Sequence, residues 1–432
     1  MLDFLCFSDA DVGDTQSRSY LQASYITRYL TSAEQRSNAF LSPLANPLRL
    51  NQLKEDCMAY DANLDLLSEH LLSPKQSNYC QRIPNIVIDS VELETTPVFA
   101  AYWYFACERQ RIFFRRIAGT NGPEYSHDKI LRSHRFTNAY RASDRVSQFL
   151  IRNVIYAPDA VANFETVFLR VLLFKLFNKI ETWTSLEKTF GPVGLRSFDV
   201  NAFDAFLTDQ FESGSRLYSA AYIMPSAGRA FGQRYKHSNH LRLLGHLLET
   251  DFPERLRRAG TMGQAFELLK GVPSLGPFLA YQYVTDLNYS DQLAFDEMEF
   301  VQAGPGALDG ISKCFVDEKG VPAETIIRHF AEHQDIYFSR LGLDFPDLWG
   351  RKLQLIDCQN LFCEISKYSR VAFPEIAGRA GRTRIKQKFS PSGRPAQPWY
   401  PPKWGINERV SAGLDYADRP SAISSAEQYT LF

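Results

Sequence analysis

The feature that most constrains the fold is the stretch KGVPSLGPFLAYQYVTDLNYSDQLAFDEMEF, from Lys270 to Phe300. Gly271 is placed to end the preceding helix in a left-handed conformation, and Pro273 prevents that helix from continuing. A second helix is expected from Pro277 to Leu287. The stretch therefore predicts two helices joined by a tight turn, within a mainly α-helical fold.

This turn predicts a contact with phosphate groups. We expect the backbone N–H groups at the start of the second helix, those of Leu275 and Gly276, to point outward without partners, which makes an anion site. A hairpin of this kind holds a nucleic-acid backbone without reading its bases. The predicted DNA-binding residues of the turn are Gly271, Ser274, Leu275 and Gly276. The structural alternative is an ordinary turn between two helices.

A second tight turn opens a helix at FVQAGPGALDGISKCF. Gly304 and Gly306 flank a proline there, and the helix N-terminus that follows is a second candidate cradle for a phosphate or a substrate. A helix start without any ligand explains the same residues. Both readings stay open at this point, and the two glycines are predicted DNA-binding residues.

An acid follows the first turn: Asp296 lies 20 positions after Gly276 (296 − 276). Hairpin, spacing and acid together resemble the helix-hairpin-helix DNA glycosylase superfamily, whose hairpin reads roughly LPGVGPxTA where this chain has VPSLGPFLA. The resemblance implies that Asp296 is the catalytic acid. It also implies a monofunctional glycosylase, because Phe278 stands where lyase-type members carry a lysine.

Charge is distributed unevenly along the chain, whose formal net charge is −1. Residues 1–72 hold ten acids and five bases, whereas residues 376–403 hold seven bases and no acid. Such asymmetry is expected when one part of a chain meets phosphates. In this Pro-, Gly- and base-rich tail the predicted DNA-binding residues are Arg379, Arg382 and Arg384. The competing role is that Trp399, Tyr400 and Trp404 fold the tail back across the core.

Cysteine and histidine usage predicts neither metal nor cofactor. The seven cysteines form no paired framework, which fits a reducing compartment. Cys358 and Cys363 are the only close pair, so we expect no iron–sulfur cluster and no other cofactor. The acidic N-terminus does not resemble a signal peptide, and the most apolar run is too short to span a membrane. We therefore expect an intracellular protein, cytoplasmic or, in a eukaryote, nuclear.

Three parts are expected along the chain: an N-terminal helical extension at 1–84, a core at 85–372 and the basic tail at 373–432. The core begins with its one strand-like region, RIPNIVIDSVELETTPVF. Thr96 followed by Pro97 then predicts a helix start, because threonine caps helices and proline fits their first turn.

Two helices of the core carry polar side chains at helical spacing. Ser143 is expected to cap a helix whose polar side carries Arg141, Asp144, Arg145 and Gln148, groups able to bond one another or a base edge. A solvated face explains the same side chains without any function. Within LQLIDCQNLFCEISKYSRV, steps of three and four residues place a polar stripe on one face. A solvated face or a pocket wall explains the stripe equally well. Its residues are Asp357, Asn360, Glu364 and Lys367.

Four blocks narrow the resemblance: YWYFACERQRIFFRR, FTNAYRASDRVSQFLI, FDEMEFVQAGPGALDGISKCF and IDCQNLFCEISKYSR. Together they resemble the α-glutamyl/putrescinyl thymine pyrophosphorylase family of DNA base hypermodification proteins, a divergent branch of the helix-hairpin-helix glycosylases. The resemblance implies a helix-hairpin-helix glycosylase-like core over roughly residues 82–371. It also implies that the partner is DNA containing modified pyrimidines.

The leading hypothesis is a DNA glycosylase that flips out a hypermodified pyrimidine and excises it, leaving an abasic site. One role for such an enzyme is defence against phages with modified DNA. Ionised Asp296 would stabilise the charge on the sugar. Asn360 and Gln359 would bond the departing base. The predicted substrate-binding residues are Arg145, Gln148, Asp357, Glu364 and Lys367. One alternative is a transferase that joins an amine to an activated 5-methylene pyrimidine in DNA; another is a DNA-binding protein without catalysis.

Overall fold

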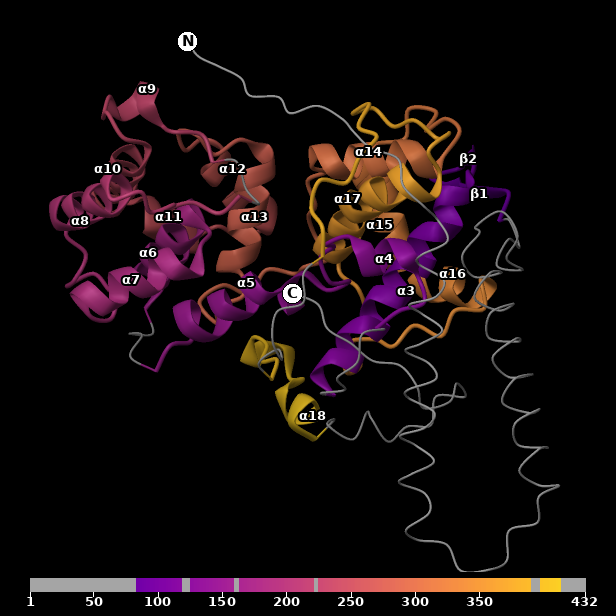
Figure 1. Cartoon of the computed structure of the whole chain (residues 1–432), viewed down its shortest axis with the longest axis horizontal. Helices are drawn as coiled ribbons and strands as arrows, with labels where there is room; N and C mark the ends of the chain where they lie inside the picture. Colours follow the sequence, from indigo (N-terminus) through magenta and orange to yellow (C-terminus); the bar gives the residue numbers. More distant parts are fainter. Residues whose placement is uncertain (1–82, 119–124, 159–162, 221–223, 390–396, 413–432) are drawn as a thin grey trace, which may run out of the picture. The chain divides into compact units, whose positions relative to one another are not determined.

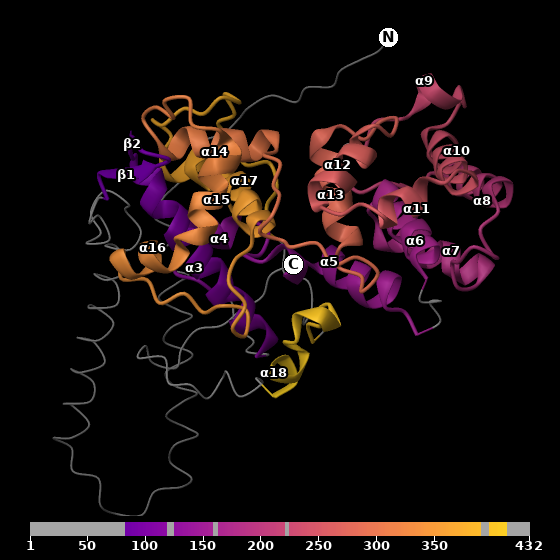
Figure 2. The same ribbon diagram turned by 180° about the vertical axis from the view of Figure 1, so that it is seen from behind.

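The computed structural model describes residues 83–118, 125–158, 163–220, 224–389 and 397–412 (Figures 1 and 2). These residues form sixteen α-helices and one two-stranded hairpin, so the predicted mainly α-helical fold is confirmed. The expected N-terminal extension lies almost wholly outside the described residues, and the three expected parts stay predictions. No helix in the described ranges is long and apolar enough to cross a membrane.

The described chain begins with the strand-like region, which is a short hairpin. Strands β1 (Asn85–Ile88) and β2 (Val91–Glu94) pair antiparallel. Helix α3 (Pro97–Ile117) follows, and the Thr96 side chain accepts a hydrogen bond from the Val98 N–H at 3.1 Å. The predicted helix start at Thr96 and Pro97 is therefore confirmed.

One group of helices packs around α17 (Leu355–Ala372) (Figure 1). Its closest partner is α14 (Pro305–Cys314), which crosses α17 so tightly that a Cβ at Gly310 would lie 2.0 Å from the Phe362 carbonyl oxygen. Only glycine fits that position. The remaining helices of this group are α3, α4 (Lys129–Ser133), α15 (Ala323–Glu332) and α16 (Gln334–Arg340).

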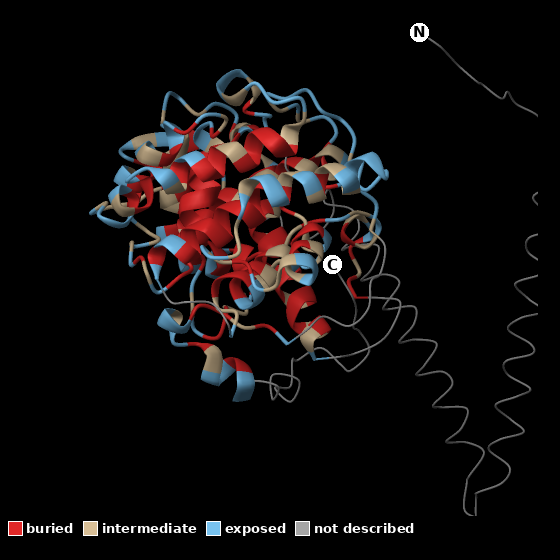
Figure 3. Cartoon of the chain, turned by 90° about the vertical axis from the view of Figure 1, so that its left-hand side faces the viewer, coloured by how far each residue is buried: buried red, intermediate tan, exposed pale blue. Residues whose placement is uncertain are grey.

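A second group packs around the almost fully buried helix α6 (Phe164–Phe177). The hydrophobic residues of α6 are buried. Figure 3 shows buried residues gathered in the interior and exposed residues along the outside. The other helices of this group are α7 (Ile180–Phe190), α8 (Val200–Glu212), α9 (Gly228–Phe231), α10 (Lys236–Glu249), α11 (Phe252–Arg257), α12 (Met262–Lys270) and α13 (Pro277–Leu287).

Helices α12 and α13 form the predicted hairpin, but two details of its turn differ from expectation. Gly271 has φ −72°, a right-handed conformation, and the left-handed residue is Ser274 with φ 72°. The Leu275 N–H is not free, since it donates to the Val272 carbonyl at 3.0 Å. The turn closes through its own backbone, so only part of the expected row of outward N–H groups is available.

The helix expected after Ser143 is shorter and less regular than the sequence pattern indicates. Residues Arg141–Ser143 form one 3₁₀ turn, α5 covers Arg145–Phe149, and Leu150–Ile155 continue as a π-helix, η2. Asp144, not Ser143, precedes α5. The Ser143 hydroxyl instead lies 2.8 Å from the Tyr400 hydroxyl, so it bonds the tail and caps no helix.

The described parts of the tail lie on the core. Residues 379–389 follow α17 and run beside α14 and α4, where Lys388 forms an antiparallel bridge with His134. Farther along, Tyr400 is fully buried, followed by the 3₁₀ turn η3 (Pro402–Trp404) and α18 (Asn407–Ala412). The folding back of Tyr400 and Trp404, expected as a competing role of the tail, is therefore present.

Candidate functional site

The polar stripe of α17 faces a protein loop. Asp357 and Glu364 are both buried, and each accepts a backbone N–H from the loop 137–144 that precedes α5. The Asp357 Oδ1 accepts the Arg141 N–H at 2.8 Å, and the Glu364 Oε2 accepts the Thr137 N–H at 3.1 Å. The sequence left two explanations for the stripe, a solvated face and a pocket wall. Neither describes these two carboxylates, because they hold a loop against the helix.

Asp357 also organises the start of α17. Its second oxygen accepts the Gln354 N–H at 3.0 Å, which completes a capping box. Burial raises the pKa of Asp357 to about 6, although the N–H groups of Gln354 and Arg141 oppose the shift. Near neutral pH the carboxylate is largely ionised and tied to two backbone donors.

A second carboxylate lies in the loop itself. Asp144 is half-buried, and its Oδ1 accepts the Asn138 N–H at 2.8 Å. Burial raises the pKa of Asp144 to about 7, and the nearby charge of Glu364 raises it further. No described residue bonds its Oδ2. Asp144 is thus a carboxyl group with a free oxygen that can accept or release a proton near neutral pH.

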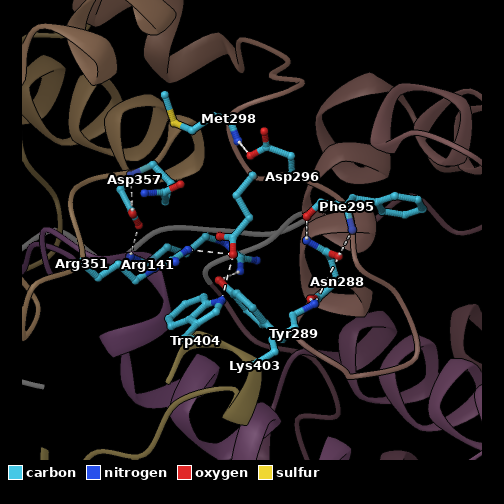
Figure 4. A network of polar contacts seen from close by, with 12 residues as sticks. Arg141, Asn288, Tyr289, Phe295, Asp296, Met298, Arg351, Asp357, Lys403 and Trp404 are labelled. Carbon is cyan, nitrogen blue, oxygen red and sulfur yellow. Dashed lines mark hydrogen bonds and ion pairs between the residues drawn. The ribbon is translucent and has the colours of Figure 1, made fainter. Parts of the chain in front are cut away.

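Arg141 connects this loop to the second group of helices (Figure 4). Its guanidinium is 3% exposed and reaches the Asp286 Oδ1 at 2.6 Å, where Lys175 forms a second ion pair at 3.0 Å. It also donates to Gln282 at 3.0 Å and to the Tyr289 hydroxyl at 2.9 Å. One residue therefore bonds α17 through its backbone and α13 through its side chain.

The remaining predicted substrate-binding residues differ in what they already contact. Gln148 is engaged: its amide donates to Ala142 at 2.8 Å and accepts the Trp399 N–H at 2.9 Å. Lys367 pairs with Glu364 at 2.6 Å. Arg145 is exposed and makes no hydrogen bond or ion pair with a described residue. Asp144 at the end of the loop and Arg145 at the start of α5 therefore have unused capacity for hydrogen bonds or ion pairs.

The two amides predicted to bond a base lie in different surroundings. Asn360 is half-buried on the α17 stripe between Asp357 and Glu364, and its side chain has no hydrogen-bond partner among the described residues. Gln359 is fully buried; its Nε2 donates to the Cys363 sulfur at 3.2 Å and its Oε1 has no described partner. Only Asn360 combines a free amide with partial exposure.

Asp296 is held by its own turn and not by this cluster. Its side chain is exposed, and its Oδ1 accepts the Met298 N–H at 2.8 Å within a turn (Figure 4). No hydrogen bond or ion pair in the described part of the chain joins it to α17 or to the loop 137–144. The next residue, Glu297, points inward instead, pairing with Arg351 at 2.7 Å and accepting the Trp404 Nε1–H at 2.9 Å.

The glycines of the second tight turn serve close packing. A Cβ at Gly304 would lie 2.6 Å from the Phe278 ring, and a Cβ at Gly306 would lie 3.0 Å from the Cys363 sulfur. In the first turn, Gly276 is exposed and a Cβ there would meet nothing within 4 Å. The first turn is open to a ligand, while the second is filled by side chains.

The three predicted basic residues of the tail are all exposed. Arg379 forms an ion pair with Glu318, whereas the side chains of Arg382 and Arg384 pair with no described residue. In the described ranges no three histidine, cysteine or acidic side chains gather as metal ligands would.

Sequence reasoning named Arg141 and Asp144 beside Arg145 and Gln148 as polar groups able to bond one another or a base edge, but it missed Asp286 and Glu297. Asp286 and Glu297 carry no local signal, because their partners lie more than 50 residues away in the sequence.

Comparison with known proteins gives the family. A family model described as 5-hmdU DNA kinase, helical domain, matches residues 96–378. The 5-hmdU DNA kinase of Bacillus phage SP10 is 25% identical over 300 residues, which cover 65% of this chain and 47% of that protein. The chain thus spans about half the length of this relative. No solved structure matches the chain significantly.

These matches correct the resemblance and the function expected from the sequence. The matching family is that of a kinase helical domain, so the assignment to the pyrophosphorylase branch of the glycosylases is wrong. The expected glycosylase activity, the excision of a base and the defence role attached to it are wrong for the same reason. Asp296 was assigned its catalytic role for base excision, so that role is withdrawn together with the glycosylase activity.

Proposed function

The chain belongs to the 5-hmdU DNA kinase helical-domain family, and we propose that it serves the phosphorylation of 5-hydroxymethyl-deoxyuridine in DNA. Its part is to hold the DNA and to present the hydroxymethyl group. The observation that carries this proposal is the family match over residues 96–378. The transferase alternative is nearer to this activity than excision is. Amine transfer and phosphorylation both act on the 5-substituent of the pyrimidine and leave the glycosidic bond intact.

In this reaction the hydroxymethyl oxygen attacks the terminal phosphorus of a nucleoside triphosphate. The bond from that phosphorus to the bridging oxygen breaks, the diphosphate leaves, and the hydroxyl proton goes to a base. The 432-residue sequence contains no Gly-Lys pair and therefore no phosphate-binding loop of the Gly-x4-Gly-Lys-[Ser/Thr] type. The proposal accordingly places the DNA side of the reaction on this chain.

Within the cluster, we assign the hydroxyl proton to Asp144. Three features support this assignment: the carboxyl group is half-buried, its Oδ2 is free, and its pKa of about 7 suits proton transfer at neutral pH. The next residue, Arg145, is exposed, and its guanidinium is available to bind a phosphate. Asp357, Glu364 and Gln148 then act by holding the loop that carries these two groups.

Asn360 is the residue we assign to the base. A uracil ring offers an N–H donor beside a carbonyl acceptor, and a side-chain amide offers the complementary pair. The backbone of the DNA is assigned to the α12–α13 hairpin, as part of the predicted helix-hairpin-helix core, and to the basic tail. Gly271, Ser274 and Gly276 stay predicted DNA-binding residues on this basis.

The test uses the full chain, a nucleoside triphosphate and a duplex that contains one 5-hydroxymethyl-deoxyuridine. The duplex is digested to nucleosides and analysed by mass spectrometry for the gain of one phosphoryl group; a thymidine duplex is the control. Phosphorylation would assign the whole activity to this chain. Without it, tighter binding of the modified duplex would still support the helical-domain role.

Two variants locate the selectivity. Asn360→Ala should reduce the preference for the modified duplex about tenfold, since one amide pair contributes about 1–3 kcal/mol. Asn85→Ala on β1, an exposed asparagine outside the cluster, should leave it unchanged. The proposal would be overturned if the full chain showed no phosphorylation and no preference for the modified duplex.

A further inference from the structure

The tail segment from Arg382 to Phe389 carries its charges in a regular pattern. Every even-numbered position from 382 to 388 is an exposed arginine or lysine: Arg382, Arg384, Lys386 and Lys388. Ile385 and Phe389 at odd positions are half-buried and pack against the core, while Thr383 and Gln387 are exposed and uncharged. In an extended chain successive side chains alternate between two faces, so an extended course of this segment would place the four cations on one face.

The backbone of this segment is fixed at both ends and in the middle. Before it, the Ala380 N–H donates to the buried Asp309 at 2.6 Å. Arg370 of α17 donates to the Arg384 carbonyl at 3.3 Å. At its end, the bridge between Lys388 and His134 is made by two backbone hydrogen bonds of 3.1 Å, from Arg135 to Gln387 and from Phe389 to Ser133. The backbone is thus held while the four side chains remain free.

No acid compensates these charges. None occurs between Ile376 and Phe389, and none of the four cations forms an ion pair with a described residue. Neighbouring elements add positive charge: Lys129 and Arg135 are exposed beside the bridge. On the other side, burial lowers the pKa of the Arg370 guanidinium; the charges of Asp309 and Glu364 oppose this shift, and the charge of Arg382 adds to it. Uncompensated positive charges in one segment repel one another, and an anionic partner would relieve that repulsion.

We propose that residues 382–388 form a ladder of cations that binds the sugar–phosphate backbone of one DNA strand. Cations two residues apart in an extended chain repeat every 6.4–6.8 Å or so, a step that a chain of phosphates can follow one group at a time. Because the backbone is already held, binding orders only side chains, which lowers its entropic cost. The identity of the strand as DNA rests on the proposed function.

The ladder is tested by the salt dependence of binding. A labelled duplex without any modified base is titrated with the full chain by fluorescence anisotropy at several salt concentrations. The ladder variant carries Arg382→Gln, Arg384→Gln, Lys386→Gln and Lys388→Gln. Each lost phosphate contact removes about 0.9 from the slope of log K against log salt, so the loss of four contacts should make the slope shallower by about 3.6. Affinity at low salt should fall at least a hundredfold.

The matched control changes net charge by the same amount on exposed residues of the second helical group: Lys188→Gln, Arg196→Gln, Arg216→Gln and Arg229→Gln. It should keep the wild-type slope. A charge-conserving variant, Arg382→Lys with Arg384→Lys, should keep it too. Thermal unfolding checks that each variant is folded, as expected for exposed side chains.

An equal loss in the ladder and control variants would overturn the ladder, because net charge alone would then explain it. An unchanged slope in the ladder variant would overturn it as well. Failure of the proposed function looks different: the ladder-dependent slope would persist on unmodified DNA, while neither phosphorylation nor preference for 5-hydroxymethyl-deoxyuridine would be found.

Discussion

At the residue scale, Arg141 shows how one side chain can join two parts of a fold. Its guanidinium neutralises Asp286, which is fully buried, and its backbone N–H is held by Asp357. A buried carboxylate that loses such a partner is costly, because neither water nor another charge fully replaces it. Lys175 remains near Asp286 and softens the loss.

Replacing Arg141 is therefore expected to destabilise the whole described fold. Arg141→Met should lower the free energy of unfolding by about 3 kcal/mol, measured by urea denaturation. Arg145→Met, four positions along and exposed, is the matched control and should stay within about 0.5 kcal/mol of wild type. A loss below about 1 kcal/mol in Arg141→Met would show that the buried ion pair does not stabilise the fold.

Asp144 predicts a pH dependence of stability. Burial raises its pKa to about 7 in the folded state, against about 3.9 in an unfolded chain. Between these values the folded state keeps a proton that the unfolded state has lost, so stability falls as pH rises through this window. Asp144→Asn removes the titration, and its amide oxygen can still accept the Asn138 N–H.

Relative to wild type, Asp144→Asn should gain about 1–2 kcal/mol of stability between about pH 5 and pH 8, a figure reduced for partial exposure of the side chain. Urea denaturation across this range measures the gain. Asp209→Asn removes the same charge from the exposed face of α8 and should keep the wild-type pH profile. A constant difference between Asp144→Asn and wild type would argue against the raised pKa.

The site was predicted from the sequence to the extent that its residues share a helix. The stripe of Asp357, Asn360, Glu364 and Lys367 follows from spacing alone, as does the grouping of Arg145 with Gln148. What the stripe faces was beyond reach, because Glu364 and Thr137 are separated by 227 residues. Charge alternation at Arg382 and Arg384 was visible in the sequence, whereas the bridge that holds it was not.

At the element scale, the α12–α13 hairpin carries an avoidable strain. Ser274 adopts φ 72°, a left-handed conformation that side chains with a Cβ disfavour. The sequence predicted the hairpin through Gly271, Pro273 and Pro277 but assigned the left-handed residue to Gly271. Glycine can adopt the left-handed conformation at little cost, but nothing obliges it to do so. Here Gly271 keeps a right-handed helical conformation.

Ser274→Gly should therefore stabilise the protein by about 1 kcal/mol, because relief of strain exceeds the added flexibility of the unfolded chain. The midpoint of urea denaturation measures this gain. Ser213→Gly after α8 is the matched control: Ser213 has φ −72°, so the same change should be neutral or slightly destabilising. A destabilised Ser274→Gly would mean that the serine side chain itself supports the turn.

The same scale shows where local patterns fail. The residues after Ser143 have the spacing of an amphipathic helix, yet they form a 3₁₀ turn, a short α-helix and a π-helix in succession. The reason is tertiary: the Ser143 hydroxyl bonds Tyr400 and the neighbouring Arg141 is fixed to α13 and α17. Contacts with distant residues decide the path of the chain here, against its local preference.

At the scale of the whole molecule, the C-terminal part of the described tail works as a brace. The Lys403 ammonium donates to the carbonyls of Ser290 and Leu293 at 3.0 and 2.7 Å, just beyond α13. The Trp404 ring lies under the Arg351 guanidinium at 3.8 Å. Together with buried Tyr400, these contacts fasten the tail to the core.

Truncation separates this brace from the rest of the tail. A chain ending at residue 396 should lose about 3–6 kcal/mol of stability through the two aromatic rings alone. A chain ending at residue 412 keeps every contact just described and should unfold at the wild-type temperature. Thermal unfolding followed by circular dichroism compares them. Equal unfolding temperatures would show that the brace is dispensable.

The general character of the molecule was readable from its sequence: mainly helical, with one strand-like region and a helical hairpin. Its chemistry was not, since a hairpin followed by an acid is shared by folds of different activity. Asp296 had the spacing of a catalytic acid and lies exposed in a turn. The structure draws attention instead to the loop held by Asp357 and Glu364.

The alternation along residues 382–388 has a consequence for how this stretch tolerates changes in length. Deleting one residue there would exchange the two faces, sending the cations toward the core and the apolar side chains toward water. Deleting two would shorten the row and preserve its phase. Variants of this segment that remain functional should therefore differ in length by even numbers, a parity rule that any set of natural sequences can check.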